Sequence, residues 1–501
     1  MRNDLNFTWN TPRVAPAPFN LPLAVICGLL MGLTHIPFGA SFLVVIPLAG
    51  LLFASAREAT PRLAARAAFF GWLAFWAIHL LWLPQSFAPS FGIAVWLLMP
   101  FVWVIEAGFN AALTWVAFRV TGKPLPFLGM MVGALVLLEW ARGLGPLAFP
   151  WGNFGYALIG TPLAQVASLG GVYLGSLIVL ICASSIAAVF FYEWRWLPVA
   201  GIVIVSSLIY GLTRPALATP TRQAWLMQGN IDPFKIFVGE TRSLEIFTGL
   251  LKSAPKDAVV VLPEAALDIT VVANLEPPLP AALRFPSVPK LLAGVSDYRQ
   301  GARLNAVAAV TNSRLLGTTD KTFLVPFGEY FLLRREASAI YDFVFRILNL
   351  PNLSSADSGR SQRILELGGE RFGAFVCYDS IFPSLPRSLV SRGAQVLVEP
   401  TNDGWFGGGA GNYQHFAMDR MRAIETGRYL LRVANTGITA SIDPNGRVLE
   451  QLPLNVEKAL LARYAPLSAI TPYVLLGDWA LWLAGAICVA AILLARSREV
   501  W

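Results

Sequence analysis

The sequence has 501 residues, of which 55% are hydrophobic and 14% are charged, and its mean hydropathy is +0.58. This composition is far more apolar than that of soluble proteins of similar length, so it indicates a membrane protein. The formal net charge of +8 does not require nucleic acid as a partner. Part of it is the bias of short membrane loops, and part belongs to a polar region expected near anionic lipid headgroups.

Eight apolar segments are long enough, or nearly long enough, to cross a bilayer. They cover residues 21–34, 36–56, 64–84, 91–118, 126–142, 163–192, 197–213 and 473–495. Seven of them precede a polar region and one follows it. No small-residue cleavage site follows the first segment, so we expect an uncleaved anchor rather than a signal peptide.

Basic residues in the short loops predict the orientation of the chain. They are Arg57, Arg62, Arg66, Arg119, Lys123, Arg195, Arg496 and Arg498, whereas the alternate loop at 84–90 carries no charge. All of them fall on one side of the membrane if both termini are cytoplasmic. We therefore expect a seven-helix membrane domain at 1–213, an extracytoplasmic domain at 214–471, and a last membrane helix with a short cytoplasmic tail at 472–501.

The polar region is predicted to be an α/β domain. Short apolar runs typical of buried strands lie at 223–227, 258–262, 291–295, 306–311, 371–377, 395–399, 429–434 and 438–442, and an amphipathic helix is expected at 413–428. Residues 443–447 read Asp-Pro-Asn-Gly-Arg, which is typical of a hairpin turn. No P-loop, dinucleotide fingerprint or metal-ligand spacing is present, so we expect neither a metal ion nor a cofactor.

Cys377 is the only one of the four cysteines outside the apolar segments. Extracytoplasmic thiols usually form disulfides, but this cysteine has no partner within its own predicted domain. It is either a reactive thiol or a buried strand residue that acts as a small hydrophobe. Taken alone, the residue leaves both interpretations open.

Two further polar residues lie where apolar strands are predicted to end. Glu264 follows the run 259–263, and Lys321 precedes the segment 322–330. Carboxylate, ammonium and thiol form a working set for acyl transfer: Glu264 as base, Lys321 as stabiliser of a carbonyl oxyanion, Cys377 as nucleophile. The alternative is a surface salt bridge between Glu264 and Lys321 beside an inert cysteine, and spacing alone does not decide between them.

The residues around these three positions resemble the nitrilase superfamily and its Glu-Lys-Cys triad. The motifs that carry the resemblance are Pro263 to Ala266, Lys321 with Leu324 to Tyr330, and Cys377-Tyr378-Asp379 with Phe382-Pro383. Together with stretches at 139–143, 149–151 and 155–156, they are similar to the apolipoprotein N-acyltransferases, the membrane-embedded branch of that superfamily. The sequence departs from this pattern at Ile236, at Asp268 and at Asp379. At the position of Asp379 the family usually has glutamate.

The resemblance implies a nitrilase-like four-layer αββα sandwich attached to about eight membrane helices, in a bacterial inner membrane with the catalytic domain in the periplasm. Cys377 would take the sn-1 acyl chain of a membrane phospholipid as a thioester. The α-amino group of a lipoprotein's diacylglyceryl-cysteine would then accept that chain, with no cofactor. The expected catalytic residues are Glu264, Lys321 and Cys377, and Glu329, Tyr378 and Asp379 are expected to support them.

Two other functions stay open from the sequence. One is a membrane-tethered amidase that passes the acyl group to water, and the other is a transporter or sensor with a ligand-binding domain. The apolar segments hold few ionisable residues, which speaks against a transporter. Among these residues, Glu139 and Arg142 lie one helical turn apart, where an ion pair would offset their burial. They are either a structural clamp or a contact to a lipid headgroup, whereas Glu106 has no evident partner. Apolar stretches at 331–333 and 340–345 are either flaps that reach the membrane or ordinary packing, and the oligomeric state is undetermined.

Overall fold

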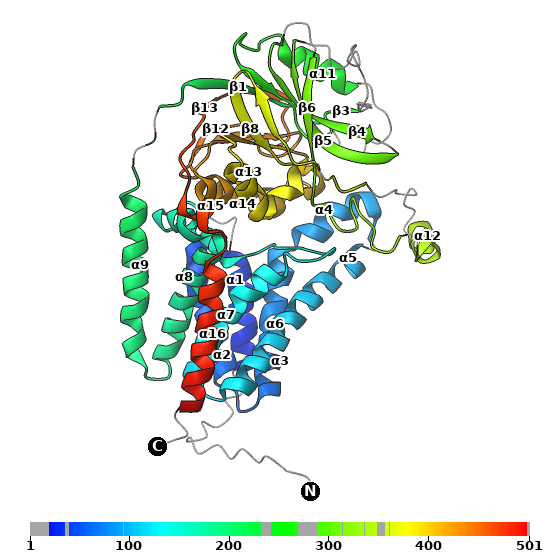
Figure 1. Ribbon diagram of the computed structural model, residues 1–501. Helices are drawn as coiled ribbons and strands as arrows, with labels where there is room; N and C mark the ends of the chain where they lie inside the picture. The colour runs from blue at the N-terminus through cyan, green and yellow to red at the C-terminus, as the bar shows by residue number, and fades with distance from the viewer. Residues whose placement is uncertain are drawn as a thin grey trace.

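The computed structural model describes residues 20–35, 40–93, 95–215, 217, 219–231, 242–268, 288–299, 301–312, 314–334, 336–347, 356–359 and 361–497. The sequence features noted at Ile236 and Arg498 lie outside this part of the chain. Figure 1 shows two parts, an α/β part and a bundle of long helices, with helices α13, α14 and α15 between them.

The bundle is built from helices on both sides of the α/β part in sequence. They are α1 (Asn20–Thr34), α2 (Val45–Ala56), α3 (Pro61–His79), α4 (Trp82–Phe91), α5 (Val95–Leu98), α6 (Pro100–Thr121), α7 (Pro124–Ala141), α8 (Ala167–Val189), α9 (Leu197–Leu212) and α16 (Ala480–Ser497). A short helix, α15 (Pro472–Leu476), precedes α16. The predicted helical membrane part is therefore confirmed.

Within the residues that the structure describes, fewer helices than apolar segments are long enough to cross a membrane. Five helical stretches of the described chain are long and apolar enough to cross a membrane: 95–121, 124–141, 162–189, 194–212 and 480–497. A sixth exists if the bent pair 61–79 and 82–88 counts as one span, and the helices at 20–34 and 41–56 are apolar but shorter. Eight spans stay a prediction.

The apolar segment at 64–84 is bent rather than straight. α3 ends at His79 and α4 begins at Trp82, with an angle of 44° between them. Pro84 has no N–H to donate to the carbonyl of Leu80, and its ring collides with that carbonyl in a continuous helix. The bend turns α4 toward the α/β part, where Figure 1 shows it.

Two β-sheets form the α/β part. The first has the order β13-β1-β2-β4-β5-β6, with β3 beside β4, and the second has the order β12-β11-β10-β9-β8-β7. Their bounds are β1 (Arg222–Gln228), β2 (Val259–Val261), β3 (Leu267–Asp268), β4 (Leu291–Arg299), β5 (Ala302–Thr311), β6 (Arg314–Asp320), β7 (Ile364–Leu367), β8 (Glu370–Ala374), β9 (Val396–Thr401), β10 (Leu430–Ala434), β11 (Ala440–Ile442), β12 (Val448–Gln451) and β13 (Lys458–Tyr464). The strands β1, β2 and β4 are parallel, as are β8, β9 and β10.

The two sheets pack face to face through apolar side chains from both, such as Leu226 and Val261 against Phe372 and Val398. Helix α11 (Arg242–Leu251) covers the outer face of the first sheet through Phe247. Helices α13 (Ser384–Ser391) and α14 (Ala410–Thr426) cover the outer face of the second. The predicted α/β class of this part is therefore confirmed.

The sequence did not reveal the strands β6, β7, β12 and β13. In β7, buried residues alternate with exposed or half-buried ones. In β12, half-buried residues alternate with exposed ones, and most residues of β13 are exposed or half-buried. β13 and β6 are the edge strands of the first sheet, and β12 and β7 are those of the second. An edge strand needs few apolar residues, so a search for apolar runs finds the central strands and overlooks the edges.

Helix α14 is buried between the second sheet and the bundle. Phe416 and Ala423 pack with the sheet, whereas Met418 and Met421 belong to the apolar core of the bundle. Gln414 connects α14 to the bundle: its Oε1 accepts hydrogen bonds from the indoles of Trp82 (2.9 Å) and Trp151 (2.7 Å), and its Nε2 donates to the carbonyl of His79 (2.9 Å).

We predict that Gln414→Ala destabilises the protein strongly. The change leaves two buried indole N–H groups and one carbonyl without a partner, at about 1–3 kcal/mol for each group. The apparent melting temperature in detergent should fall by several degrees. Gln451→Ala is the matched control, since Gln451 is exposed on β12. Equal melting temperatures for both variants would show that these bonds contribute nothing to stability.

Candidate active site

The candidate nucleophile lies on a strained turn. β8 ends at Ala374, and Cys377 begins a short 3₁₀ helix, η6 (Cys377–Ile381), with a φ of +50°. The prediction that a strand runs through Cys377 is therefore wrong. A non-glycine residue in this conformation costs of the order of 1–3 kcal/mol and persists only where its surroundings hold it.

Asp379 holds one side of this turn. Its carboxylate accepts hydrogen bonds from the backbone N–H groups of Val376 (3.0 Å), Thr322 (3.1 Å) and Phe323 (2.8 Å). The bond to Val376 replaces the ladder hydrogen bonding that would have continued β8. Burial raises the pKa of Asp379 to about 7, although its hydrogen bonds oppose the rise. The carboxylate thus joins the turn to the segment that follows Lys321.

The ammonium of Lys321 lies between two carboxylates. Its Nζ donates to Oε1 of Glu264 (2.9 Å) and to Oε1 of Glu329 (2.7 Å), and Asn305 also donates to Oε1 of Glu264 (2.6 Å). Lys321 is 1% exposed and Glu264 is 5% exposed. The pair is therefore a buried one, and the alternative of a surface salt bridge is wrong.

The thiol of Cys377 completes this group. Cys377 is itself buried, and its thiol lies near enough to Glu264 and Lys321 for their charges to act on its pKa. Burial, followed by the negative charge of Glu264, raises the pKa of Cys377 well above its ordinary value. The resting cysteine is therefore a thiol rather than a thiolate, so its attack on a carbonyl needs a base.

The charges of Glu264 and Lys321 suit the need of Cys377 for a base. Burial raises the pKa of Glu264, which is offset in part by Lys321. Burial also lowers the pKa of Lys321, but Glu264 and Glu329 outweigh that effect and hold its pKa well above the ordinary value. Lys321 is therefore a permanent cation beside a carboxylate of raised basicity.

The structure brings the three predicted catalytic residues together from three strand ends. Glu264 follows β2, Lys321 follows β6 directly, and Cys377 lies just after β8. Among the predicted supporting residues, Glu329 binds Lys321 and Asp379 holds the turn. Their catalytic roles stay predictions.

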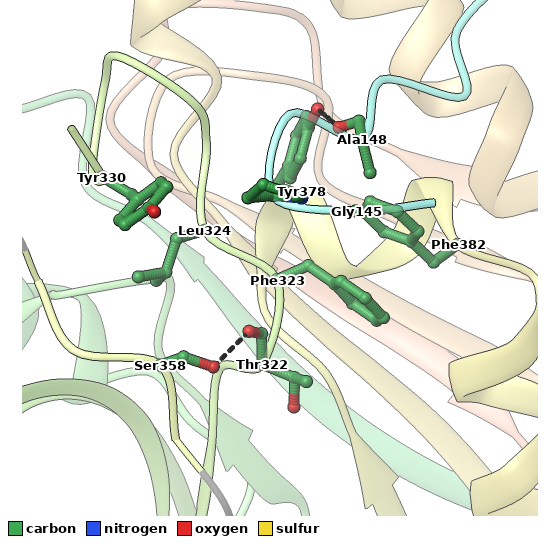
Figure 2. A pocket seen from close by; sticks show the side chains of 10 residues that line it. Gly145, Ala148, Thr322, Phe323, Leu324, Tyr330, Ser358, Tyr378 and Phe382 are labelled. Carbon is green, nitrogen blue, oxygen red and sulfur yellow. Dashed lines mark hydrogen bonds between the residues drawn. The ribbon is translucent and has the colours of Figure 1, made fainter. Parts of the chain in front are cut away.

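Tyr378 connects the turn to the bundle rather than to the other site residues. Its hydroxyl donates to the carbonyl of Ala148 at 2.8 Å, in the loop after α7 (Figure 2). Its ring packs in the bundle core beside Phe382. The residue is therefore a core aromatic as well as an anchor between the two parts of the molecule.

A mainly apolar cavity of about 210 Å³ adjoins the site at the junction of the two parts (Figure 2). Its lining residues are Gly145, Pro146, Ala148, Thr322, Phe323, Leu324, Tyr330, Ser358, Tyr378 and Phe382. Thr322 follows Lys321, and Tyr378 follows Cys377, so the cavity lies next to two of the three candidate catalytic residues. Its walls come from both the α/β part and the loop that follows α7.

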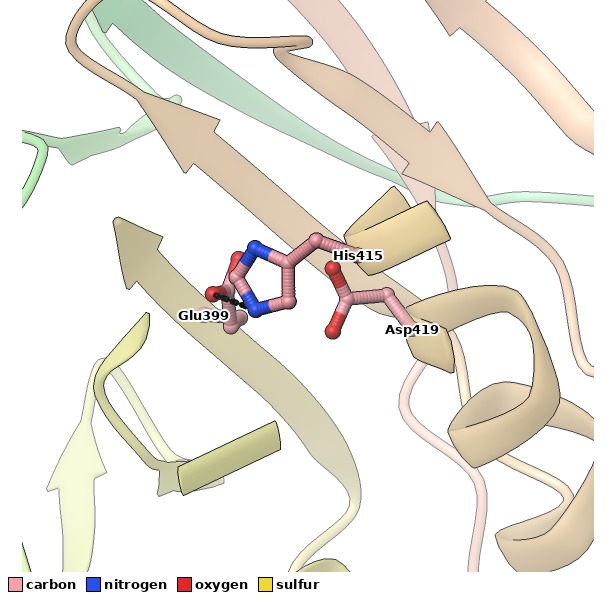
Figure 3. A group of neighbouring side chains, drawn as sticks. All are labelled: Glu399, His415 and Asp419. Atoms are coloured by element: carbon pink, nitrogen blue, oxygen red, sulfur yellow. Dashed lines mark ion pairs between the residues drawn. The ribbon is translucent and has the colours of Figure 1, made fainter. Parts of the chain in front are cut away.

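One group of side chains in the described chain has metal-ligand proximity. Oxygen and nitrogen atoms of Glu399, His415 and Asp419 lie within 4.8 Å of one another (Figure 3). However, the guanidinium of Arg432 already donates to Glu399 (2.9 Å) and to Asp419. A cation between these carboxylates would meet the charge of Arg432, so we assign the group to a buried ion-pair cluster.

The sequence analysis missed several polar partners of the site. Asn305 lies on β5 just before the apolar run predicted as a strand, and its amide binds Glu264. In the bundle, Glu106 does have a partner, because Arg142 lies 3.5 Å from it. Glu139 instead accepts the backbone N–H of Phe154 at 2.8 Å, so the expected pair of Glu139 with Arg142 gives way to these two contacts.

Comparisons with known proteins agree with this arrangement. Residues 27–185 match the family model of the apolipoprotein N-acyltransferase N-terminal domain, and residues 291–469 match that of carbon–nitrogen hydrolases. Three similar proteins, each named apolipoprotein N-acyltransferase, come from Methylococcus capsulatus, Gloeobacter violaceus and Azotobacter vinelandii. The first is 31% identical over 91% of this chain and 92% of its own length; the second is 32% identical over 95% and 94%. The third is 31% identical over 96% of both chains. The chain therefore belongs to the apolipoprotein N-acyltransferase family.

Proposed function

We propose that the protein transfers an sn-1 acyl chain from a membrane phospholipid to the α-amino group of the diacylglyceryl-cysteine of apolipoproteins, through a thioester on Cys377. One observation carries the proposal. A buried Glu264–Lys321–Cys377 group lies beside an apolar cavity, where the α/β part meets helices that are apolar enough to cross a membrane.

In the first step, the carboxylate of Glu264 takes the thiol proton while the sulfur of Cys377 attacks the ester carbonyl. Lys321 stabilises the oxyanion. An ammonium has three N–H donors and two of those of Lys321 bind Glu264 and Glu329, so one is left for the substrate. The carbon–oxygen ester bond then breaks, and Glu264 returns the proton to the departing lysophospholipid.

In the second step, the amine of the lipoprotein attacks the thioester carbonyl. Glu264 takes a proton from the nitrogen, the carbon–sulfur bond breaks, and the proton returns to the thiolate of Cys377. An ester and an amine thus give an amide and an alcohol. A thioester is already activated toward amines, so the chain needs neither ATP nor a cofactor.

The surroundings of the site favour lipid substrates over a small soluble amide. Exposed apolar side chains occur on the segments at the junction, including Ile93 (84%), Leu97 (76%), Ile340 (66%) and Phe343 (59%). Figure 1 shows α5 and α12 (Ser338–Ile347) standing out at this level. Such side chains suit the interface of a bilayer, where both proposed substrates are held.

The inner membrane of a bacterium is the proposed location. The basic loop residues support cytoplasmic termini and a periplasmic catalytic domain. The connection between α8 and α9, which contains Arg195, lies at the end of the bundle remote from the α/β part (Figure 1). We keep the domain boundaries at 1–213, 214–471 and 472–501, with eight spans.

The transfer is tested with purified protein in phospholipid vesicles and a synthetic diacylglyceryl-cysteine peptide. We expect the peptide to gain an amide-linked acyl chain and the vesicles to gain one lysophospholipid for each chain transferred. Release of free fatty acid in place of acyl peptide would support the amidase alternative. Absence of both products would contradict enzymatic acyl transfer and favour a transporter or sensor.

We predict that Cys377→Ala lowers turnover roughly a thousandfold or more, as expected when a nucleophile is removed from a group that acts as a unit. The measurement is acyl-peptide formation in the vesicle assay. Cys182→Ala is the control, because Cys182 is a free cysteine buried in α8. Wild-type turnover in Cys377→Ala would rule out this residue as the nucleophile.

We predict that Glu264→Gln blocks formation of the acyl-enzyme while phospholipid still binds. The amide keeps the shape of the side chain but cannot accept the thiol proton, so Cys377 stays protonated. Single-turnover kinetics and lipid binding are measured in parallel, with Glu457→Gln at an exposed position as control. A normal rate in Glu264→Gln would assign the base to another residue.

We predict that Lys321→Arg loses roughly a hundredfold or more in acyl-enzyme formation, although the charge is kept. A planar guanidinium cannot direct its donors to Glu264, Glu329 and the substrate oxygen as a compact ammonium does. Lys458→Arg, on the exposed edge of β13, is the control. Full activity of Lys321→Arg would reduce the role of Lys321 to bulk charge.

A further inference from the structure

A second set of polar side chains lies beneath the nucleophile turn. The Oγ of Ser380 is 2.9 Å from Nε2 of His415, and Nδ1 of the same ring is 3.0 Å from Oδ1 of Asp403. Nε2 also lies 3.3 Å from the carbonyl oxygen of Cys377. Ser380 is in η6, three residues after Cys377, so the ring contacts both ends of the first turn of η6.

These contacts have the order of a Ser-His-Asp triad, which raises the question of a second nucleophile. Burial answers it. Ser380 is 0% exposed, and His415 and Asp403 are each 1% exposed. The cavity in Figure 2 is lined by Tyr378 and Phe382, on either side of Ser380 in the sequence, but Ser380 does not line it. Cys377 does not line it either, but Cys377 is 8% exposed, whereas Ser380 is fully buried and its hydroxyl is bonded to His415. Cys377 is therefore the more accessible nucleophile of the two.

The protonation states of the set follow from its charged neighbours. Burial raises the pKa of Asp403, but Arg432 and His415 outweigh burial and bring it to about 2, so the carboxylate is ionised. Burial, and then the charge of Arg432, lower the pKa of His415, so the ring is neutral. The neutral ring bridges the two sides: its Nδ1 lies beside Asp403 and Arg432, and its Nε2 lies beside the hydroxyl of Ser380 and the carbonyl of Cys377.

We propose that His415 is a positioning residue for Cys377: held by Asp403, it fixes the turn of the nucleophile through Ser380. The proposal rests on the function proposed above and adds residues to its site. Asp379 holds the entry to the turn at Val376, and Ser380 holds its other end. The positive φ of Cys377 is thereby fixed from two directions, which a strained nucleophile requires.

The same helix turn is tied to the bundle. Gln414, the neighbour of His415 on α14, binds Trp82, Trp151 and the carbonyl of His79. A ring that positions the thiol is thus attached to the helices that border the lipid. The position of Cys377 is therefore fixed relative to the membrane as well as relative to Glu264.

Ser380→Ala is the sharpest test, because it removes only the hydroxyl that joins the turn to the ring. Ser441→Ala is the matched control, since Ser441 is also fully buried and its hydroxyl binds the carbonyl of Arg463 at 2.7 Å on β13. His415→Ala is less informative, because it also opens a cavity in the core. Single-turnover acylation by phospholipid vesicles gives both a rate constant and a final acylated fraction.

We expect Ser380→Ala to lower the rate constant about tenfold to a hundredfold, as a misplaced reacting group does. The acylated fraction and the phospholipid concentration for half-saturation should match those of Ser441→Ala. A rate constant within about twofold of the control would overturn the proposal. A loss of acylated fraction at an unchanged rate constant would also overturn it, because that is the result of partial unfolding.

Two further measurements separate this proposal from the proposed function. The alkylation rate of Cys377 by iodoacetamide needs no acyl transfer, and we expect Ser380→Ala to change it severalfold relative to Ser441→Ala. If the wild-type protein forms no thioester, the proposed function fails, while alkylation still decides whether Ser380 positions the thiol. An acyl ester on Ser380 in the Cys377→Ala background would instead identify a second nucleophile and contradict the positioning role.

Discussion

Helix α14 is buried on both sides, and the placement of the candidate site depends on the polar contacts that it makes in each direction. Gln414 binds the bundle, His415 lies beneath the nucleophile turn, and Glu425 accepts the backbone N–H of Val172 at 2.8 Å. That last contact falls where α8 is kinked at Gly170 and Gly171, so Glu425 caps the second half of α8. Buried polar groups must be paired, and this requirement fixes the α/β part in one position on the helices.

The electrostatics of the site follow from burial. A lone ammonium or carboxylate would be costly at this depth, but Lys321 is paired with Glu264 and Glu329, and Asn305 adds a donor to Glu264. Removing one member would leave the charges of the others uncompensated, so we expect the group to act as a unit. The buried surroundings also keep Cys377 protonated at rest. In the proposed mechanism, such a thiol is activated only when its base acts, so it is protected from side reactions while no substrate is bound.

Much of this arrangement could be predicted from the sequence because the central strands are continuous apolar runs, and Glu264, Lys321 and Cys377 follow them. The end of β8 could not be predicted, because Phe375 and Val376 are as apolar as strand residues. The turn that ends the strand depends on the carboxylate of Asp379. Side-chain contacts between residues that are distant in sequence could not be predicted either. Asn305 reaches Glu264 across the first sheet, and His415 reaches Ser380 from another helix. Single residues carry no signal of such contacts, whereas periodic patterns do.

The central claim is that Cys377 carries the acyl chain between donor and acceptor. The most direct test is the intact mass of the purified protein after incubation with phospholipid vesicles and no lipoprotein. The account predicts a mass gain of one acyl chain, located on Cys377 by peptide mapping and removed by neutral hydroxylamine, which cleaves thioesters. A protein that stays unmodified, yet N-acylates its acceptor when both substrates are supplied, would contradict the thioester route and indicate direct transfer.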